Sequence, residues 1–141
     1  MWRVVLDNAA LTSALLNPHG SAARLLDYAH DGRLRLFTTN RMLALEDKVL
    51  RHPALTQWHG LDTKGIKEVI KDLPVLLCLV ESSAGKKRPH EGMAAELAQC
   101  ASWSHADFVV TAIRLPAHEV QQGGTQIIKA DQLVKLVGHE S

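Results

Sequence analysis

The chain has 141 residues, of which 46% are hydrophobic and 22% are charged. This is the composition of one globular domain, which excludes disordered and collagen-like chains. Sixteen basic and fifteen acidic residues give a net charge of +1, so global charge does not predict strong nucleic-acid binding. The longest apolar run, 74–80, is far shorter than the roughly 20 residues of a membrane-spanning helix.

The N-terminal stretch predicts a buried strand followed by a helix. The run 3–6 is short and β-branched and is bounded by polar residues, whereas Leu11, Ala14 and Leu15 recur at helical spacing. Arg3 and Asp7 interrupt the apolar N-terminus, which argues against a signal peptide, and we expect a cytoplasmic protein with no membrane segment. Asp7 lies at the strand-to-helix turn. Ligands bind at this edge of parallel sheets, so Asp7 is either a functional residue or the N-cap of the helix.

Three further elements are predicted up to residue 52. Ser21 is the expected N-cap of a helix that ends at Asp31-Gly32, where glycine accepts a left-handed conformation. A second strand is expected over 34–37, and Thr38-Thr39 offers an N-cap to the next helix. The expected apolar face of that helix consists of Met42, Leu45, Val49 and Leu50.

The middle of the chain is harder to interpret. Residues 53–60 allow a single helical turn, and Asp62 or Thr63 is the expected cap of a helix with Ile66, Val69, Ile70 and Leu73 on one face. The run 74–80 fits either a strand or a helix restarted by Pro74, and we favour the helix. The segment 82–89 has the composition of an exposed linker.

The C-terminal part predicts a helix over about 90–102, strands over 107–111 and 126–128, and a final helix marked by Leu133, Val134 and Val137. Strands alternate with helices throughout the chain. The prediction is therefore one three-layer α/β/α domain with a central parallel sheet of four to five strands.

Common motifs for catalysis are absent from the sequence. It contains no glycine-rich phosphate loop, no nucleophile elbow and no zinc-protease motif. Cys78 and Cys100 are isolated, so we interpret both as small core residues. The basic run of Lys86, Lys87 and Arg88 is a local candidate for contacts to nucleic-acid phosphates, although a solvated loop is the favoured explanation because a run of three charges is short.

The order of several segments resembles a known family. These segments are V-L-D at 5–7, S-A-L-L-N-P-x-G-S-x-A-R-L-L-D at 13–27, D-G-R-L-R-L at 31–36, V-L-R-H-P at 49–53, A-D-F-V-V-T at 106–111 and I-I-K-A-D-Q-L-V-K-L at 127–136. Together they resemble the bacterial PIN-domain family of toxin–antitoxin ribonucleases. The resemblance implies a parallel sheet with helices on both faces and Mg²⁺- or Mn²⁺-dependent cleavage of RNA.

The resemblance also implies a set of site residues. Converging carboxylates hold the metal ions, which activate water and stabilise the phosphate in the transition state. Asp7 matches the first family acid, whereas Ala9 replaces the polar residue that usually follows it. Alignment on Val49 and Leu50 places Leu45 at the second acid. Glu46 is one residue, or about 100°, away on the helix and takes that role only if the helix slips by one residue.

The remaining family acids are replaced. Glu91 is a possible substitute for the third acid and His90 a possible metal ligand, although Glu91 alternatively decorates a helix N-terminus. Ile113 occupies the position of the fourth acid. Asp107 begins the same strand and is therefore expected at the opposite edge of the sheet.

Two functional hypotheses follow. The favoured one is a degenerate PIN domain with lost or weakened ribonuclease activity that binds RNA or a protein partner, such as an antitoxin-like protein. The alternative is an active endoribonuclease toxin whose rearranged Mg²⁺ or Mn²⁺ site contains Asp7, Glu46 and Glu91. Self-association is also expected, with Trp58, Trp103 and Leu115 as candidates for an exposed apolar face.

Overall fold

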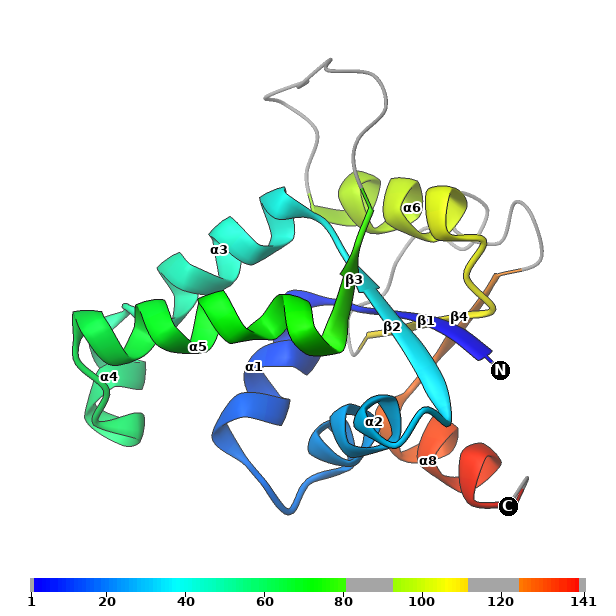
Figure 1. Cartoon of the computed structure of the whole chain (residues 1–141), viewed down its shortest axis with the longest axis horizontal. Coiled ribbons are helices and arrows are strands. Elements are labelled where there is room, and N and C mark those ends of the chain that lie inside the picture. Colours follow the sequence, from blue (N-terminus) through cyan, green and yellow to red (C-terminus); the bar gives the residue numbers. More distant parts are fainter. Residues whose placement is uncertain (1, 81–92, 112–124, 140–141) are drawn as a thin grey trace.

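A five-stranded parallel sheet forms the centre of the computed structural model, which describes residues 2–80, 93–111 and 125–139. The strand order is β3-β2-β1-β4-β5 (Figure 1). The strands are β1 (Trp2–Leu6), β2 (Leu34–Thr38), β3 (Leu77–Leu79), β4 (Phe108–Val110) and β5 (Gln126–Ile128). All four strand pairs are parallel, which confirms the predicted fold class.

Seven helices belong to the described residues. They are α1 (Asn8–Leu16), α2 (Ser21–His30), α3 (Asn40–Leu50), α4 (Pro53–His59), α5 (Thr63–Leu76), α6 (Met93–Ser104) and α8 (Ala130–His139). In Figure 1, α6 lies on one side of the sheet, whereas α1, α2 and α8 lie on the other. None of the helices in this part of the chain is long and apolar enough to cross a membrane.

Alternation along β1 divides the core into two layers. Val4 and Leu6 belong to the cluster that includes Leu25 of α2 and Leu133 of α8. Val5 points to the other cluster, which includes Leu97 of α6. Successive side chains of a strand point to opposite faces, so the apolar and buried residues 4–6 of β1 require helices on both faces.

Several sequence-based boundaries agree with the structure. Gly32 has a φ of 78° after α2, and the side chains of Thr39 and Asp62 cap α3 and α5. Ser21 is the first residue of α2 rather than its cap, which is Gly20. Within 53–60, Pro53–His59 form the seven-residue helix α4, and Gly60 is its C-cap.

Two predictions are wrong in part. The helix favoured for 74–80 ends at Leu76, and residues 77–79 form the edge strand β3, because pairing with β2 satisfies their backbone groups. On α3, the buried side chains are those of Met42, Leu43, Glu46 and Leu50. Leu45 and Val49, which the sequence placed on this face, are only half-buried. The helix is thus rotated so that Glu46 faces the protein interior.

Candidate functional site

The candidate site lies at the carboxyl edge of the sheet, between β1 and β4. The chain proceeds from β1 to β2 on one side and from β4 to β5 on the other, so the strand order reverses at this point. Crevices at such switch points are the usual ligand sites of parallel α/β sheets. Asp7 follows β1, and Thr111 follows β4.

Asp7 is both the N-cap of α1 and a partner of the neighbouring strand. One of its carboxylate oxygens, Oδ1, accepts a hydrogen bond from the backbone N–H of Ala10 at 2.6 Å. The other, Oδ2, accepts a hydrogen bond from the hydroxyl of Thr111. Only 1% of Asp7 is exposed. The cap interpretation of Asp7 is therefore confirmed, and the same carboxylate also joins the ends of β1 and β4.

Glu46 is brought to the same edge from α3. Its Oε1 accepts a hydrogen bond from the Asn8 amide at 3.0 Å, and its Oε2 accepts one from the Thr12 hydroxyl at 2.6 Å. The side chain is fully buried. Alignment on Val49 and Leu50 predicts that Glu46 points away from the site. This prediction is wrong, because α3 buries the face that contains Glu46 rather than Leu45.

Burial raises the pKa of the Glu46 carboxyl. The hydrogen bonds from Thr12 and Asn8 favour the ionised form and oppose this rise, whereas the negative charge of Asp7 adds to it. The effect of Asp7 shows that the two carboxyl groups interact electrostatically. Such a buried pair is a feature of functional sites and also of structural networks.

Among the described residues, two buried side-chain oxygens have no hydrogen-bond partner. They are Oδ1 of Asn8 and Oγ1 of Thr38. The orientation of the Asn8 amide is settled by its nitrogen, which donates to the backbone carbonyl of Met42 at 2.9 Å as well as to Glu46. Thr38 ends β2, the strand that pairs with β1. Both oxygens are thus neutral acceptors near the carboxyl edge.

Other predicted site residues are either distant or not described. Asp107 lies at the opposite edge, as expected, where its Oδ2 accepts a hydrogen bond from the backbone N–H of Arg3 at 2.9 Å. His90 and Glu91, and the basic run of Lys86, Lys87 and Arg88, lie outside the described residues, as does Ile113.

The described residues do not form a metal centre by themselves. In ranges 2–80, 93–111 and 125–139, no group of three or more His, Cys, Asp or Glu side chains is positioned to hold a metal ion. Asp7 and Glu46 provide two carboxylates, and each of their four oxygens already accepts a hydrogen bond. A divalent cation would need these oxygens and additional ligands.

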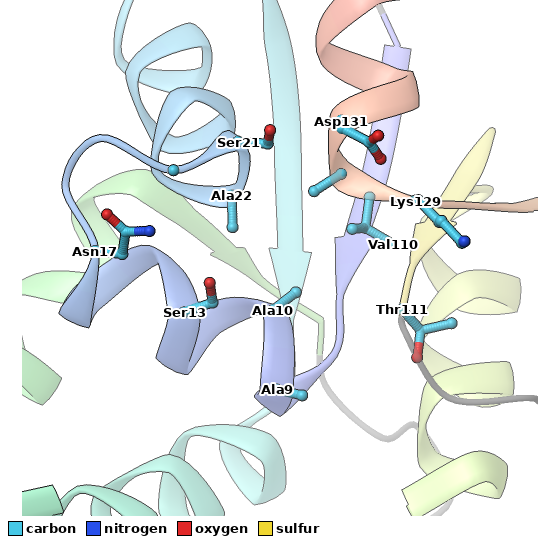
Figure 2. A pocket seen from close by; sticks show the side chains of 12 residues that line it. Ala9, Ala10, Ser13, Asn17, Ser21, Ala22, Val110, Thr111, Lys129 and Asp131 are labelled. Carbon is cyan, nitrogen blue, oxygen red and sulfur yellow. The ribbon is translucent and has the colours of Figure 1, made fainter.

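A cavity of about 360 Å³ opens on another side of α1 (Figure 2). Residues of α1, of the first turn of α2, of the end of β4 and of the start of α8 line it. Its polar side chains are those of Ser13, Asn17, Ser21, Thr111, Lys129 and Asp131. Thr111 also donates its hydroxyl hydrogen to Asp7, so the cavity adjoins the carboxylate pair through this one residue.

Sequence reasoning missed the hydrogen-bond donors of the site. Asn8 and Thr12 are four residues apart on α1 and therefore share one helix face. Glu46 is four residues from both Met42 and Leu50, so it interrupts an apolar face at the expected period. A buried carboxylate requires hydrogen-bond donors. The four-residue spacing of Asn8 and Thr12 on α1, and the position of Glu46 on the apolar face of α3, together predict that these two helix faces meet.

Comparisons with known proteins do not identify a relative. No family model, no curated protein and no solved structure matches the chain.

Proposed function

We propose that the chain is a degenerate PIN-like domain that acts as a nucleic-acid or protein binding module. In this proposal, Asp7 and Glu46 hold the helices against the sheet and no longer support metal-dependent ribonuclease activity. The observation that carries it is the saturation of both carboxylates. They are 1% and 0% exposed, and the donors to all four oxygens come from the chain itself.

The chemistry of phosphodiester cleavage supports this choice. A catalytic Mg²⁺ or Mn²⁺ ion is hard and strongly hydrated, and proteins hold it through several oxygen ligands while substrate and water occupy other positions. A cation at Asp7 and Glu46 would have to displace the hydroxyl hydrogen bonds of Thr12 and Thr111. Two carboxylates provide little compensation for that loss.

A second candidate is the active endoribonuclease with a rearranged Mg²⁺ or Mn²⁺ site. The specific observation in its favour is that α3 brings Glu46 to the edge that holds Asp7, close enough for the charge of Asp7 to raise the pKa of Glu46. Close carboxylates that repel one another are stabilised by a cation. In this reading Glu91 and His90 complete the ligand set.

The partner of the binding module is proposed from surface chemistry. Lys86, Lys87 and Arg88 would contact phosphates if the partner is RNA. An antitoxin-like protein or a second copy of the chain would instead use an apolar surface. Trp58 is 72% exposed and fits such a surface, Trp103 is half-buried, and Leu115 lies outside the described residues. A cytoplasmic location belongs to the same proposal.

A metal titration distinguishes the two candidates. Binding of Mn²⁺ is measured by calorimetry up to millimolar concentration, together with cleavage of single-stranded RNA, for the wild type, Asp7→Asn and Asp72→Asn. Asp72 is an exposed acid of α5 and is the matched control. A degenerate domain shows neither binding nor cleavage in any of the three proteins. Binding and cleavage that are lost in Asp7→Asn and kept in Asp72→Asn would refute the degenerate domain and establish the nuclease.

A test of RNA binding completes the experiment. Binding of labelled single-stranded RNA is followed by anisotropy in the wild type and in a variant with alanine at 86, 87 and 88. If the basic run contacts phosphates, the variant binds more weakly and its affinity depends less on salt. Equal affinity and equal salt dependence would exclude this run from the interface.

A further inference from the structure

Helix α4 is held in place by hydrogen bonds rather than by the core. It has no buried residue, although it packs against α3. A histidine stands at each end: His52 is the N-cap, and His59 is the last helical residue. Both side chains use ring nitrogens as hydrogen-bond acceptors, and a histidine nitrogen accepts only while it is unprotonated.

At the N-terminal end, the side chain of His52 accepts a hydrogen bond from the one backbone N–H of the first turn that would otherwise have no acceptor. Pro53 has no N–H, and the N–H groups of Leu55 and Thr56 donate to the carbonyl of His52 at 2.9 and 3.0 Å. The remaining N–H is that of Ala54, which donates to Nδ1 of His52 at 3.2 Å. The start of α4 therefore depends on a neutral imidazole.

At the C-terminal end, His59 links α4 to both neighbouring segments. Its Nδ1 accepts a hydrogen bond from the N–H of Leu61 at 2.8 Å. The ring proton must then be on Nε2, which lies 2.8 Å from the carbonyl oxygen of Leu50 at the end of α3 and donates to it. The N–H of Gly60, which has a left-handed conformation, donates to the carbonyl of Thr56 and so caps α4 itself.

Protonation affects the two ends differently. A second ring proton on His52 replaces the acceptor of Ala54 by a donor and places a positive charge at a helix N-terminus, where it is unfavourable. A second proton on His59 breaks the bond to Leu61, but its charge lies beside helix C-termini and the bond to Leu50 remains. The first turn is therefore the part that opens.

Charged groups around the helix do not cancel this effect. On the last turns of α3, Asp47 is paired with Arg51 at 3.0 Å, and Lys48 is exposed. At the start of α5, Asp62 accepts a hydrogen bond from the N–H of Gly65 at 2.8 Å, and Lys64 is exposed. Both acids are already engaged by these partners.

We propose that α4 is a proton-sensitive clasp, in which neutral His52 keeps the first turn folded and proton uptake opens that turn, while the hydrogen bond from His59 to Leu50 keeps the other end on α3. Opening of the turn therefore accompanies acidification. The inference does not depend on the proposed function.

The test is amide hydrogen exchange measured by NMR, with rates corrected for the intrinsic effect of pH. Between pH 7.5 and 5.5, we expect protection of the Ala54 amide to fall about fivefold, the factor that corresponds to one N-cap hydrogen bond. Protection of the Gly60 amide stays constant. Unchanged protection at Ala54, or an equal loss at Gly60, would overturn the proposal.

Two variants make the test specific. His52→Asn replaces the cap by a side chain that does not titrate, so α4 stays folded and the protection of Ala54 becomes independent of pH. His30→Asn changes an exposed histidine at the end of α2 and retains the fivefold fall. A pH-dependent Ala54 in His52→Asn would assign the effect to another group and refute the clasp.

Discussion

Replacement of Asp7 by alanine measures how much this carboxylate contributes to folding. The change removes the N-cap acceptor for the Ala10 N–H, which contributes about 1 kcal/mol in typical helices. It also removes the acceptor for the Thr111 hydroxyl, and a hydrogen bond to a charged group contributes about 1.5–3 kcal/mol. We therefore expect Asp7→Ala to lower the free energy of unfolding by about 2.5–4 kcal/mol.

Asp7→Asn is the matched variant. The amide oxygen can still accept from the Ala10 N–H, and the amide nitrogen can donate to the Thr111 hydroxyl oxygen, because a hydroxyl both donates and accepts. The free energy of unfolding should then stay within about 1 kcal/mol of the wild type. The variant also removes the negative charge that raises the pKa of Glu46.

Urea unfolding followed by circular dichroism gives both values, provided that the slope with denaturant is unchanged. The reasoning fails if Asp7→Ala costs less than about 0.5 kcal/mol, since the cap alone should exceed that value. It also fails if Asp7→Asn is as destabilising as Asp7→Ala. In that case the charge of Asp7, rather than its hydrogen bonds, would be the stabilising feature.

Three other changes test the packing and the electrostatics. Burial raises the pKa of Glu46 in the folded state, so the favourable contribution of this carboxyl to stability is complete below its pKa in the unfolded chain and is lost as pH rises through the folded pKa. Glu46→Gln should therefore melt at a higher temperature than the wild type at pH 8 but not at pH 4. The opposite trend would contradict the direction of the shift. Leu25→Ala removes a fully buried core side chain and should lower the free energy of unfolding in urea by about 2–5 kcal/mol, whereas Val75→Ala, at an 85% exposed position, should change it by less than about 0.5 kcal/mol. Similar values for the two variants would be inconsistent with the described core. Thr39→Ala removes the cap of α3 and should cost about 1 kcal/mol, while Thr39→Ser should restore most of it, and a serine variant no better than alanine would exclude capping as the cause.

The sequence was sufficient for the fold because the signals are local. Residues 4–6 are apolar at every position, which requires a strand covered on both faces, and caps such as Thr39 and Asp62 mark the helix starts. The run 74–80 was ambiguous because its first residues complete α5 and its last residues form β3. Only pairing with β2, a long-range contact, separates the two parts.

The candidate site was predicted less well, because its geometry depends on the rotation of one helix. Leu45 and Glu46 differ by about 100° around α3, and the apolar residues on this helix are too numerous to select one face from periodicity alone. The polar residues of α1 resolve the choice. Asn8 and Thr12 lie on one face and need an acceptor, and Glu46 is the residue of α3 that supplies it.

The same contacts bear on whether the carboxylate pair is a remnant or a working site. A cation gains from two adjacent negative charges, but here each charge is already stabilised by two hydrogen bonds from fixed elements: the first turn of α1, Thr111, Asn8 and Thr12. Hydrogen bonds to charged groups contribute about 1.5–3 kcal/mol each, so their loss is comparable with the gain from weak cation binding. The raised pKa of Glu46 further disfavours cation binding, because a proton competes with the cation for the same carboxylate. Additional anionic ligands would favour cation binding, and the described residues do not provide them.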